Sequence, residues 1–223
     1  MTTIDFDQYA RDYKALIAAQ TGFFDRDQDY FIRYKIERLK RIAGDARAIL
    51  DFGCGIGRST PYLRDIFPDA SLVGCDPSRE SLALAHEQNP GAHFVALDAL
   101  PETQSFDLAL ASCVFHHIAP NDRQAALAFC HARLKPGGRL VIFEHNPLNP
   151  VTRRLVSTCP FDADAVLLGM SETTARMRDA GFAIETKAYC LFFPGSLAAL
   201  RPVEDRLGWL PFGGQYFVAG VRR

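Results

Sequence analysis

Short apolar runs alternate with amphipathic segments of helical length through the middle of the chain. The apolar runs are residues 46–52, 70–76, 92–98, 106–114 and 138–145, and the segments 58–67, 78–88 and 121–134 lie between them. Runs of this kind are typical of parallel strands that are buried on both faces and joined by crossover helices. The pattern therefore predicts an α/β fold built on a doubly wound, mostly parallel sheet.

The two ends of the chain follow a different pattern. Residues 6–42 are helical in character, with a break near Gly22. Their second half, 30–44, carries apolar residues at helical spacing and ends at Gly44. We expect helices there, placed before the first strand.

The last third of the chain predicts one more helix and two more strands. Residues 171–182 suit a helix with Ser171 as its N-cap, and the segments 182–193 and 213–221 suit strands. Two stretches rich in proline and large apolar residues, 146–169 and 193–213, suit insertions that wall a pocket.

We therefore expect a single domain over residues 1–223, with insertions after strands 5 and 6. It would consist of an N-terminal helical cap (1–44), a ligand-binding core (45–145), and a part that faces the substrate (146–223).

Apolar residues recur every three or four positions in the second insertion. The stripe consists of Leu197, Leu200, Val203, Leu207 and Leu210. Such a stripe predicts a core or dimer contact. Two alternatives are an aromatic wall for an apolar substrate and a surface that docks on a membrane.

Composition limits the partners of the chain. Its 223 residues are 48% hydrophobic and 23% charged, and its net charge is −1. Because like charges form no long block, a nucleic-acid partner is not expected. The six cysteines are far apart in the sequence and fit reduced thiols. The first residues are acidic, and no apolar run is long enough to span a membrane. We expect a cytoplasmic monomer or homodimer with a small-molecule partner.

Glycine recurs at Gly53, Gly55 and Gly57, directly after the first apolar run. A loop this poor in side chains lets backbone N–H groups approach a ligand. A dinucleotide fingerprint needs glycine where this chain has Arg58, which argues against an NAD-dependent oxidoreductase. Asp51, just before the loop, would repel a pyrophosphate and attract an ammonium or sulfonium group. The loop therefore predicts a zwitterionic ligand.

Acidic residues also end the second and third apolar runs. Asp76 is placed to accept hydrogen bonds from the two hydroxyls of a ribose. Asp98 is placed to accept from an exocyclic adenine amine. The segment 110–118, after the fourth run, would face the reacting end of the ligand.

Five motifs in this order resemble those of the class I S-adenosylmethionine-dependent methyltransferases. They are D-x-G-x-G-x-G at 51–57, Asp76-Pro77, Asp98-Ala99, FDLALASCVFHHI at 106–118 and LKPGGRLVIFE at 134–144. The resemblance covers residues 47–145, and the last strand continues it more weakly. It implies a Rossmann-like sheet of seven strands in the order 3-2-1-4-5-7-6, with the seventh antiparallel. It also implies S-adenosylmethionine as cofactor and S-adenosylhomocysteine as product.

The resemblance also assigns residues to parts of the cofactor. It places Asp51, Gly53 and Gly55 at the methionine portion, Asp76 at the ribose, Pro77 beside the adenosine, Asp98 and Ala99 at the adenine, Ser112 and His117 near the methyl end, and Tyr13 over the cofactor.

Methyl transfer from a sulfonium is an in-line displacement, so the protein supplies orientation, exclusion of water and, for an alcohol or phenol, a base. His117 and His145 are the candidate catalytic residues, because imidazole titrates near neutral pH. We expect His116 to be structural. Glu144 suits a hydrogen-bond anchor, and an acid, a base or a helper of His145 are its alternatives. The run 144–146 by itself does not predict a metal site, so none is expected.

The function expected from the sequence is methyl transfer to an oxygen or nitrogen of a small molecule. Two alternatives stay open: a methyltransferase that acts on a lipid-linked acceptor at a membrane surface, and an inactive S-adenosylmethionine-binding regulatory module.

Overall fold

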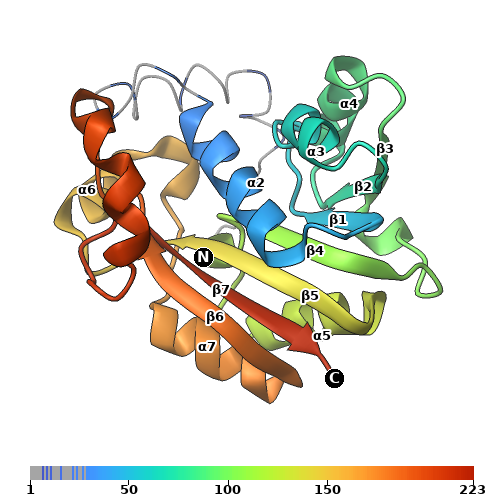
Figure 1. Ribbon diagram of the computed structural model, residues 1–223. Coiled ribbons are helices and arrows are strands. Elements are labelled where there is room, and N and C mark those ends of the chain that lie inside the picture. Colours follow the sequence, from blue (N-terminus) through green and yellow to red (C-terminus); the bar gives the residue numbers. More distant parts are fainter. Residues whose placement is uncertain are drawn as a thin grey trace.

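The computed structural model describes residues 7, 9, 11, 16, 22, 24, 27 and 29–223. Its centre is a seven-stranded sheet in the order β3-β2-β1-β4-β5-β7-β6 (Figure 1). β7 is antiparallel to both of its neighbours, and the other paired strands are parallel. The predicted fold class and strand order are confirmed. The strands are β1 (Ala48–Phe52), β2 (Ser71–Asp76), β3 (His93–Ala96), β4 (Phe106–Ser112), β5 (Leu134–His145), β6 (Phe182–Cys190) and β7 (Gln215–Arg222).

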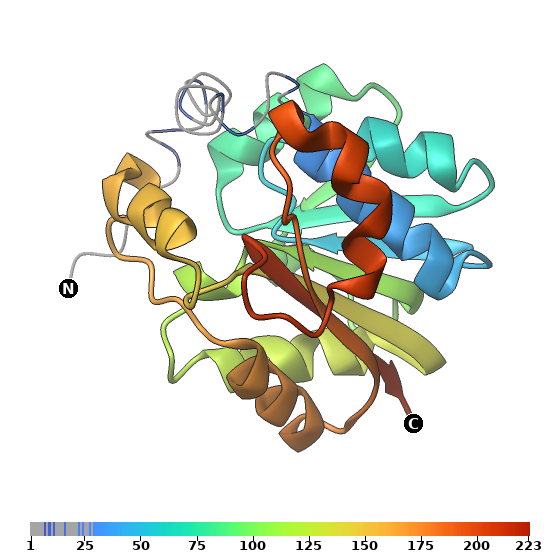
Figure 2. The same ribbon diagram turned by 60° about the vertical axis from the view of Figure 1, so that its left-hand side comes forward.

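Helices cover both faces of this sheet (Figures 1 and 2). The α-helices are α2 (Tyr30–Ala43), α3 (Thr60–Ile66), α4 (Arg79–Gln88), α5 (Arg123–Arg133), α6 (Pro150–Thr158) and α7 (Met170–Asp179). The 3₁₀ helices are η2 (Leu97–Ala99), η3 (Phe115–His117), η4 (Pro160–Asp162) and η5 (Gly195–Arg206).

The core consists of two main layers because successive side chains of a strand point to opposite faces. In β4, Leu108 packs in one cluster with Leu39 of α2, on the face that also carries α3. The next residue, Ala109, packs in the other cluster with Leu127 of α5 and with Met177 of α7. The central strands are therefore apolar throughout, as expected for a sheet covered on both sides.

Two element boundaries differ from the sequence prediction. Ser171 is not the N-cap of α7, because the helix begins at Met170 and its first backbone hydrogen bond runs from Thr173 N–H to the carbonyl oxygen of Gly169. β5 begins at Leu134 rather than at Gly138, because its pairing with β4 continues past an irregularity in the register.

The helix η5 lies against α2 (Figure 2). Asp205 forms ion pairs with Arg38 and, at 2.6 Å, with Arg41 of α2. The Arg201 guanidinium lies 3.5 Å from the centre of the Tyr30 ring. Polar and cation–π contacts, rather than an apolar stripe, thus attach this insertion to the domain.

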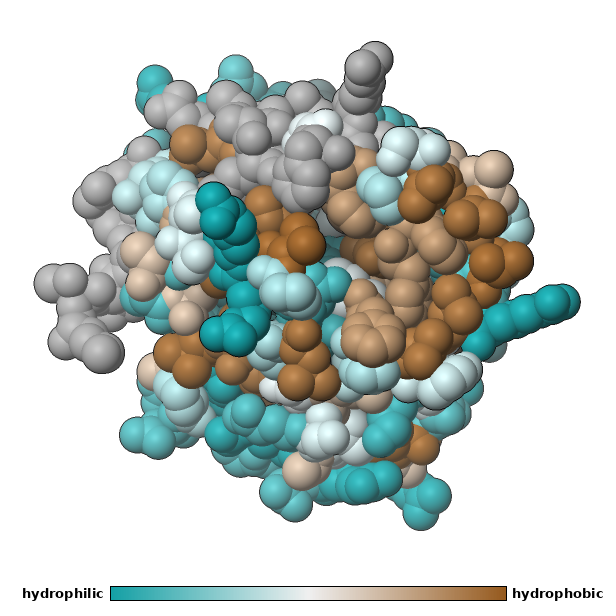
Figure 3. Space-filling model, turned by 90° about the vertical axis from the view of Figure 1, so that its left-hand side faces the viewer, coloured by the Kyte–Doolittle hydropathy of each residue, from teal (hydrophilic) through white to brown (hydrophobic). Residues whose placement is uncertain are grey.

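Three of the five stripe residues face solvent, so the interpretation of the stripe as core is wrong for the part that lies in η5; Leu207 and Leu210, beyond the helix, are half-buried, and the dimer contact stays a prediction. Leu197, Leu200 and Val203 are 47%, 44% and 40% exposed, and beyond the helix Trp209 and Phe212 are 76% and 69% exposed. Figure 3 shows apolar side chains gathered at the right of the face that carries η5. We call these five residues the apolar face.

The reason lies in the geometry of η5. It is a kinked 3₁₀ helix with a proline inside, so residues at α-helical spacing do not all turn toward the sheet. Its buried residue is instead Glu204, whose carboxylate accepts the N–H groups of Phe192 and Phe193 at 3.0 Å.

Among the described residues, no helix combines the length and the apolar character that crossing a lipid bilayer requires.

Candidate active site

The sequence-predicted residues meet at the carboxyl edge of the sheet. Asp51 lies near the end of β1, Asp76 and Ser112 end β2 and β4, and Glu144 and His145 end β5. In open α/β sheets this edge is where ligands bind, at the point where the strand order reverses. Here β1 has β2 on one side and β4 on the other, so the reversal lies at the glycine loop.

The glycine loop requires residues without a side chain. Gly53, Gly55 and Gly57 have φ angles of +73°, +52° and +73°, which L-residues rarely adopt. A Cβ on Gly53 would lie 2.6 Å from a methyl group of Val114. A Cβ on Gly55 would meet no described atom within 4 Å. Within the part of the chain that the structure describes, the backbone at Gly55 therefore borders open space that a ligand can occupy.

Asp76 holds this loop in place. One carboxylate oxygen accepts the N–H of Gly55 at 2.8 Å, and the other accepts the N–H of Ser78 at 2.9 Å. A carboxylate can accept about four hydrogen bonds, so two lone pairs are left for ribose hydroxyls. Burial raises the pKa of Asp76, although both backbone hydrogen bonds act in the opposite direction.

The Asp51 carboxylate is buried, and one of its oxygens lacks a hydrogen-bond partner among the described residues. The residue is 5% exposed, and its Oδ2 has no hydrogen-bond partner among the described residues. Burial, followed by the charge of Asp76, raises the pKa of Asp51 to about 7, while Lys35 lowers it. An unpaired carboxylate at such a site is costly unless a positively charged group arrives. Asp51 is therefore suited to a cationic ligand.

Lys35 is a site residue that sequence reasoning missed. It lies on α2 among apolar neighbours and is only 6% exposed. Its ammonium donates to the hydroxyl of Ser112 at 2.9 Å and contacts Cys113 Sγ at 3.3 Å. On the sequence it looks like one more charged position of an amphipathic helix, and no spacing signal distinguishes it.

Glu144 organises the loop that follows β4. Its Oε1 accepts the N–H groups of Val114 and Phe115 at 2.9 and 2.7 Å, and its Oε2 accepts from His116 Nδ1 at 2.6 Å. Glu144 is fully buried, so it serves as a hydrogen-bond anchor. Its imidazole partner in this geometry is His116 rather than His145.

His116 lies between two carboxylates. Glu144 contacts its Nδ1, and Asp162 Oδ1, from η4, lies 3.6 Å from its Nε2. Burial opposes a charge on the ring, but the charge of Glu144 and the contact with Asp162 raise the pKa of His116 to about 10. Burial likewise opposes ionisation of Glu144, but His116 lowers the pKa of this carboxyl to about 2.

The two predicted catalytic histidines flank His116. Ring centroids lie 4.0 Å apart for His116 and His117, and 4.9 Å apart for His116 and His145. Burial, followed by the charge of His116, lowers the pKa of His117 to about 4 and that of His145 to about 3. Both imidazoles are therefore neutral near pH 7 and suit hydrogen bonding to a substrate better than proton abstraction.

The other predicted ligand-binding residues lie as follows. Pro77 and Asp98 with Ala99 are exposed at the ends of β2 and β3, on the same edge of the sheet as the glycine loop. Tyr13, which was expected to cover the cofactor, lies outside the described residues.

An open hollow of about 740 Å³ adjoins the histidines. Arg153 and Arg154 of α6 and Asp162 of η4 line it. Asp162 also contacts His117, with 3.3 Å between its Oδ1 and His117 Nε2, so this one residue links the wall of the hollow to the histidine cluster. Sequence reasoning missed both arginines and Asp162, although it expected the segment 146–169 to wall a pocket.

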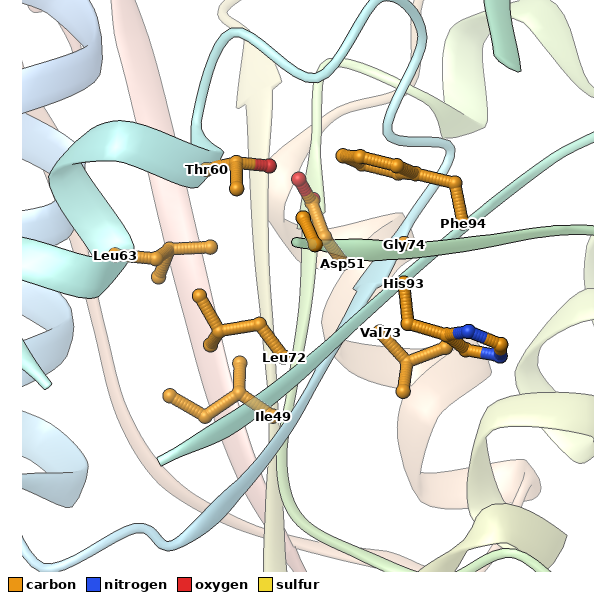
Figure 4. A pocket seen from close by; sticks show the side chains of 10 residues that line it. Ile49, Asp51, Thr60, Leu63, Leu72, Val73, Gly74, His93 and Phe94 are labelled. Carbon is orange, nitrogen blue, oxygen red and sulfur yellow. The ribbon is translucent and has the colours of Figure 1, made fainter. Parts of the chain in front are cut away.

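A second, much smaller cavity of about 10 Å³ lies among Ile49, Leu63, Leu72 and Val73 below Asp51 (Figure 4). This volume holds one water molecule at most. It is a packing gap between β1, β2 and α3, and not a ligand site.

The sheet order, the glycine loop and the acids that end β1 and β2 define the class I nucleotide-binding fold of methyltransferases. A family model described as "Methyltransferase domain" matches residues 50–140. Residues 50–140 therefore match a methyltransferase domain, and the sheet around them has the strand order that the resemblance to the class I, S-adenosylmethionine-dependent enzymes implies.

Individual relatives agree with this class. A trans-aconitate 2-methyltransferase of Variovorax paradoxus is 33% identical over 146 residues, which are 64% of this chain and 56% of the relative. A malonyl-[acyl-carrier protein] O-methyltransferase of Herminiimonas arsenicoxydans is 37% identical over 97 residues, 43% of this chain and 36% of the relative. The matches thus span about half or less of these curated relatives.

Among solved structures, a possible histamine N-methyltransferase of Thermotoga maritima, described as SAM-dependent, has a similar fold. Its TM-score is 0.70 at 18% identity, and the match covers 98% of both chains. The likeness confirms the fold.

Proposed function

We propose that the chain is an active S-adenosylmethionine-dependent methyltransferase, and that it methylates a carboxylate oxygen of a small anionic molecule. The use of S-adenosylmethionine is inferred mainly from Asp51. Its Oδ2 is buried and has no partner among the described residues, and it lies near the open backbone at Gly55. S-adenosylmethionine brings both an ammonium and a sulfonium to such a site, which would compensate this carboxylate.

In this proposal the residues at the carboxyl edge hold the cofactor in the arrangement that the sequence predicts. Asp51, Gly53 and Gly55 surround its methionine portion, with Ser112 nearby. Asp76 receives the ribose hydroxyls. Bound S-adenosylmethionine supplies the activated methyl group, so the protein needs to orient the acceptor and exclude water.

The acceptor is inferred from the hollow. Arg153 and Arg154 are exposed side chains on its wall, and they suit a carboxylate through paired N–H donors. Both relatives named above are named for compounds that carry a free carboxylate. A carboxylate is already ionised at neutral pH, so its methylation needs no base. This agrees with the lowered pKa values of His117 and His145. We assign these two residues the role of orienting the acceptor.

The test is turnover with a panel of acceptors. Purified protein is incubated with S-adenosylmethionine and, separately, with small dicarboxylates and tricarboxylates, amines and phenols, and products are identified by mass spectrometry. We expect S-adenosylhomocysteine together with a methyl ester. Methylated amines or phenols alone would exclude the carboxylate acceptor, and ligand binding without any turnover would favour the inactive regulatory module.

Arginine substitutions test the hollow. In the double variant Arg153→Gln/Arg154→Gln we expect KM for the acceptor to rise at least about tenfold, because hydrogen bonds to charged groups contribute about 1.5–3 kcal/mol each. The matched control is Arg178→Gln on α7, which is exposed and does not line the hollow. Equal KM values in the double variant and the control would place the acceptor elsewhere.

A second candidate function is supported by the apolar face. Its large exposed side chains suit a methyltransferase that acts on a lipid-linked acceptor at a membrane surface. Co-sedimentation with vesicles of neutral and of anionic lipids tests it. Retention in the pellet that is lost in Trp209→Ser/Phe212→Ser would support this function, whereas protein that stays in the supernatant excludes it.

A further inference from the structure

The histidine cluster brings together three side chains that the sequence keeps apart. His116 and His117 lie on η3, after β4, and Asp162 ends η4 within the insertion after β5. His117 Nε2 lies 3.3 Å from Asp162 Oδ1, and His116 Nε2 lies 3.6 Å from the same oxygen. All three atoms lie within 4.8 Å of one another. We propose that they bind a divalent transition-metal ion of the zinc type.

The two distances from Asp162 Oδ1 fit coordination better than an ordinary N–H···O hydrogen bond. Asp162 is 8% exposed, and its Oδ1 has no hydrogen-bond partner among the described residues despite two ring nitrogens nearby. Both nitrogens are farther from this oxygen than the about 2.7–3.2 Å of an ordinary N–H···O hydrogen bond. Ligand atoms about 2.0–2.1 Å from a tetrahedral ion lie about 3.3 Å from one another. Both contacts of Asp162 Oδ1 are near that separation.

The surroundings supply the outer contacts that metal-binding histidines usually have. His116 Nδ1 bonds to Glu144 Oε2 at 2.6 Å, and Glu144 is itself held by the N–H groups of Val114 and Phe115. A carboxylate on Nδ1 fixes the ring and directs the lone pair of Nε2 toward the ion. Glu144 would thus be a positioning residue for the ligand His116.

The donor set selects the kind of ion. Two imidazole nitrogens and one carboxylate suit zinc or a neighbouring transition metal, whereas magnesium and calcium prefer oxygen ligands. Three protein ligands leave a fourth position open. Asp162 lines the hollow and the His117 side chain is 17% exposed, so that position faces the hollow.

The sequence predicts no metal site, because the run 144–146 alone does not supply a set of clustered ligands. The third donor, Asp162, lies far along the chain and reaches the histidines only through the fold. Ion binding itself does not depend on the proposed function. A role for the ion, to hold the acceptor oxygen beside Arg153 and Arg154, does rest on it.

The test is metal binding measured without cofactor or acceptor. Protein that has been treated with a chelator and dialysed is titrated with Co²⁺, followed by visible absorption, and with Zn²⁺ in competition with a chromophoric chelator. We expect one ion per chain and visible bands typical of low coordination number. We expect the affinity to fall at least tenfold in Asp162→Asn and in His117→Ala.

The matched control is His93→Ala, which removes an exposed histidine outside the cluster and should leave the affinity unchanged. Thermal melting with and without Zn²⁺ verifies that each variant is folded, and only wild type and the control should be stabilised by the ion. No stoichiometric binding, or equal binding by all variants, would overturn the proposal and leave a protonated His116 between two carboxylates. A thiolate-to-cobalt charge-transfer band would overturn it too, because it would place the ion on cysteine.

Because these readouts contain no turnover, they separate the metal site from the methyltransferase activity. A protein that binds the ion but methylates no carboxylate would refute the proposed acceptor alone.

Discussion

Asp51 and Asp76 lie at the same edge of the sheet but differ in the hydrogen-bond partners of their carboxylates. Asp76 accepts two backbone N–H groups and stabilises the glycine loop, whereas Asp51 Oδ2 has no partner among the described residues. The residue pattern indicated that both are functional. It did not indicate that one of them also has a structural duty, because backbone donors leave no trace in the sequence.

The pH dependence of cofactor binding follows from Asp51. Its pKa of about 7 means that the carboxyl is largely protonated below that pH and ionised above it. A cationic ligand binds the ionised form, so affinity should rise as pH increases through about 7, with proton release on binding. Titration calorimetry with S-adenosylmethionine from pH 6 to pH 8, as approximate limits, measures this. Asp51→Asn is the control for titration of the ligand, and an identical profile in both proteins would contradict the role of Asp51.

The ribose contact of Asp76 can be tested with an isosteric change. Asp76→Asn keeps one oxygen for the loop but removes the charge, so we expect S-adenosylhomocysteine to bind about 1.5–3 kcal/mol more weakly. Calorimetry gives the affinity, and circular dichroism verifies the fold. An unchanged affinity would show that the ribose lies elsewhere.

At the scale of elements, the loop between β1 and α3 combines two demands on its glycines. Gly53 must avoid the side chain of Val114, and Gly55 must leave space beside the backbone. Both have a positive φ, which side-chain-bearing residues rarely adopt, so glycine is favoured at both positions for the same backbone reason. Only the packing around them distinguishes the two positions.

This difference in packing predicts different outcomes for two alanine variants: Gly53→Ala should lose more stability, and Gly55→Ala should lose ligand affinity. Gly53→Ala should lose stability by strain, about 1–2 kcal/mol, and by overpacking, about 1–3 kcal/mol. Gly55→Ala should lose stability by backbone strain alone. It should also weaken binding of the adenosyl ligand, because the added methyl group enters the open space. Denaturant unfolding and calorimetry measure the two effects. Equal loss of stability in both variants would refute the distinction.

At the scale of the whole molecule, the adenosyl ligand in the proposed site would contact the ends of β1, β2 and β4, so its binding should stabilise the complete fold. At a concentration one hundred times Kd, a ligand adds about 2.7 kcal/mol, which for a chain of this size raises Tm by about 5–10 °C. We expect this shift with S-adenosylhomocysteine and no shift with NAD. A melting scan measures it, and stabilisation by NAD would contradict the zwitterionic site.

Most of the architecture could be predicted from the sequence, because it depends on local periodicity and on ordered motifs. The alternation of strands and helices and the glycine loop are of this kind, whereas the strand order was implied by the resemblance to a known family. The interpretation of the η5 stripe failed because a helical period does not reveal whether a segment is an α-helix or a kinked 3₁₀ helix.

The sequence by itself determined the alternation of strands and helices and the glycine loop, and it placed the carboxylates of Asp51 and Asp76 at the ends of neighbouring strands. These features are local, since each strand and the residue that ends it are adjacent in the chain. Only the tertiary structure decided which distant side chains meet. It buried Lys35 beside Ser112 and brought Asp162 within 3.3 Å of His117. Such contacts depend on how helices and insertions pack on the sheet edge, and no spacing along the chain encodes that packing.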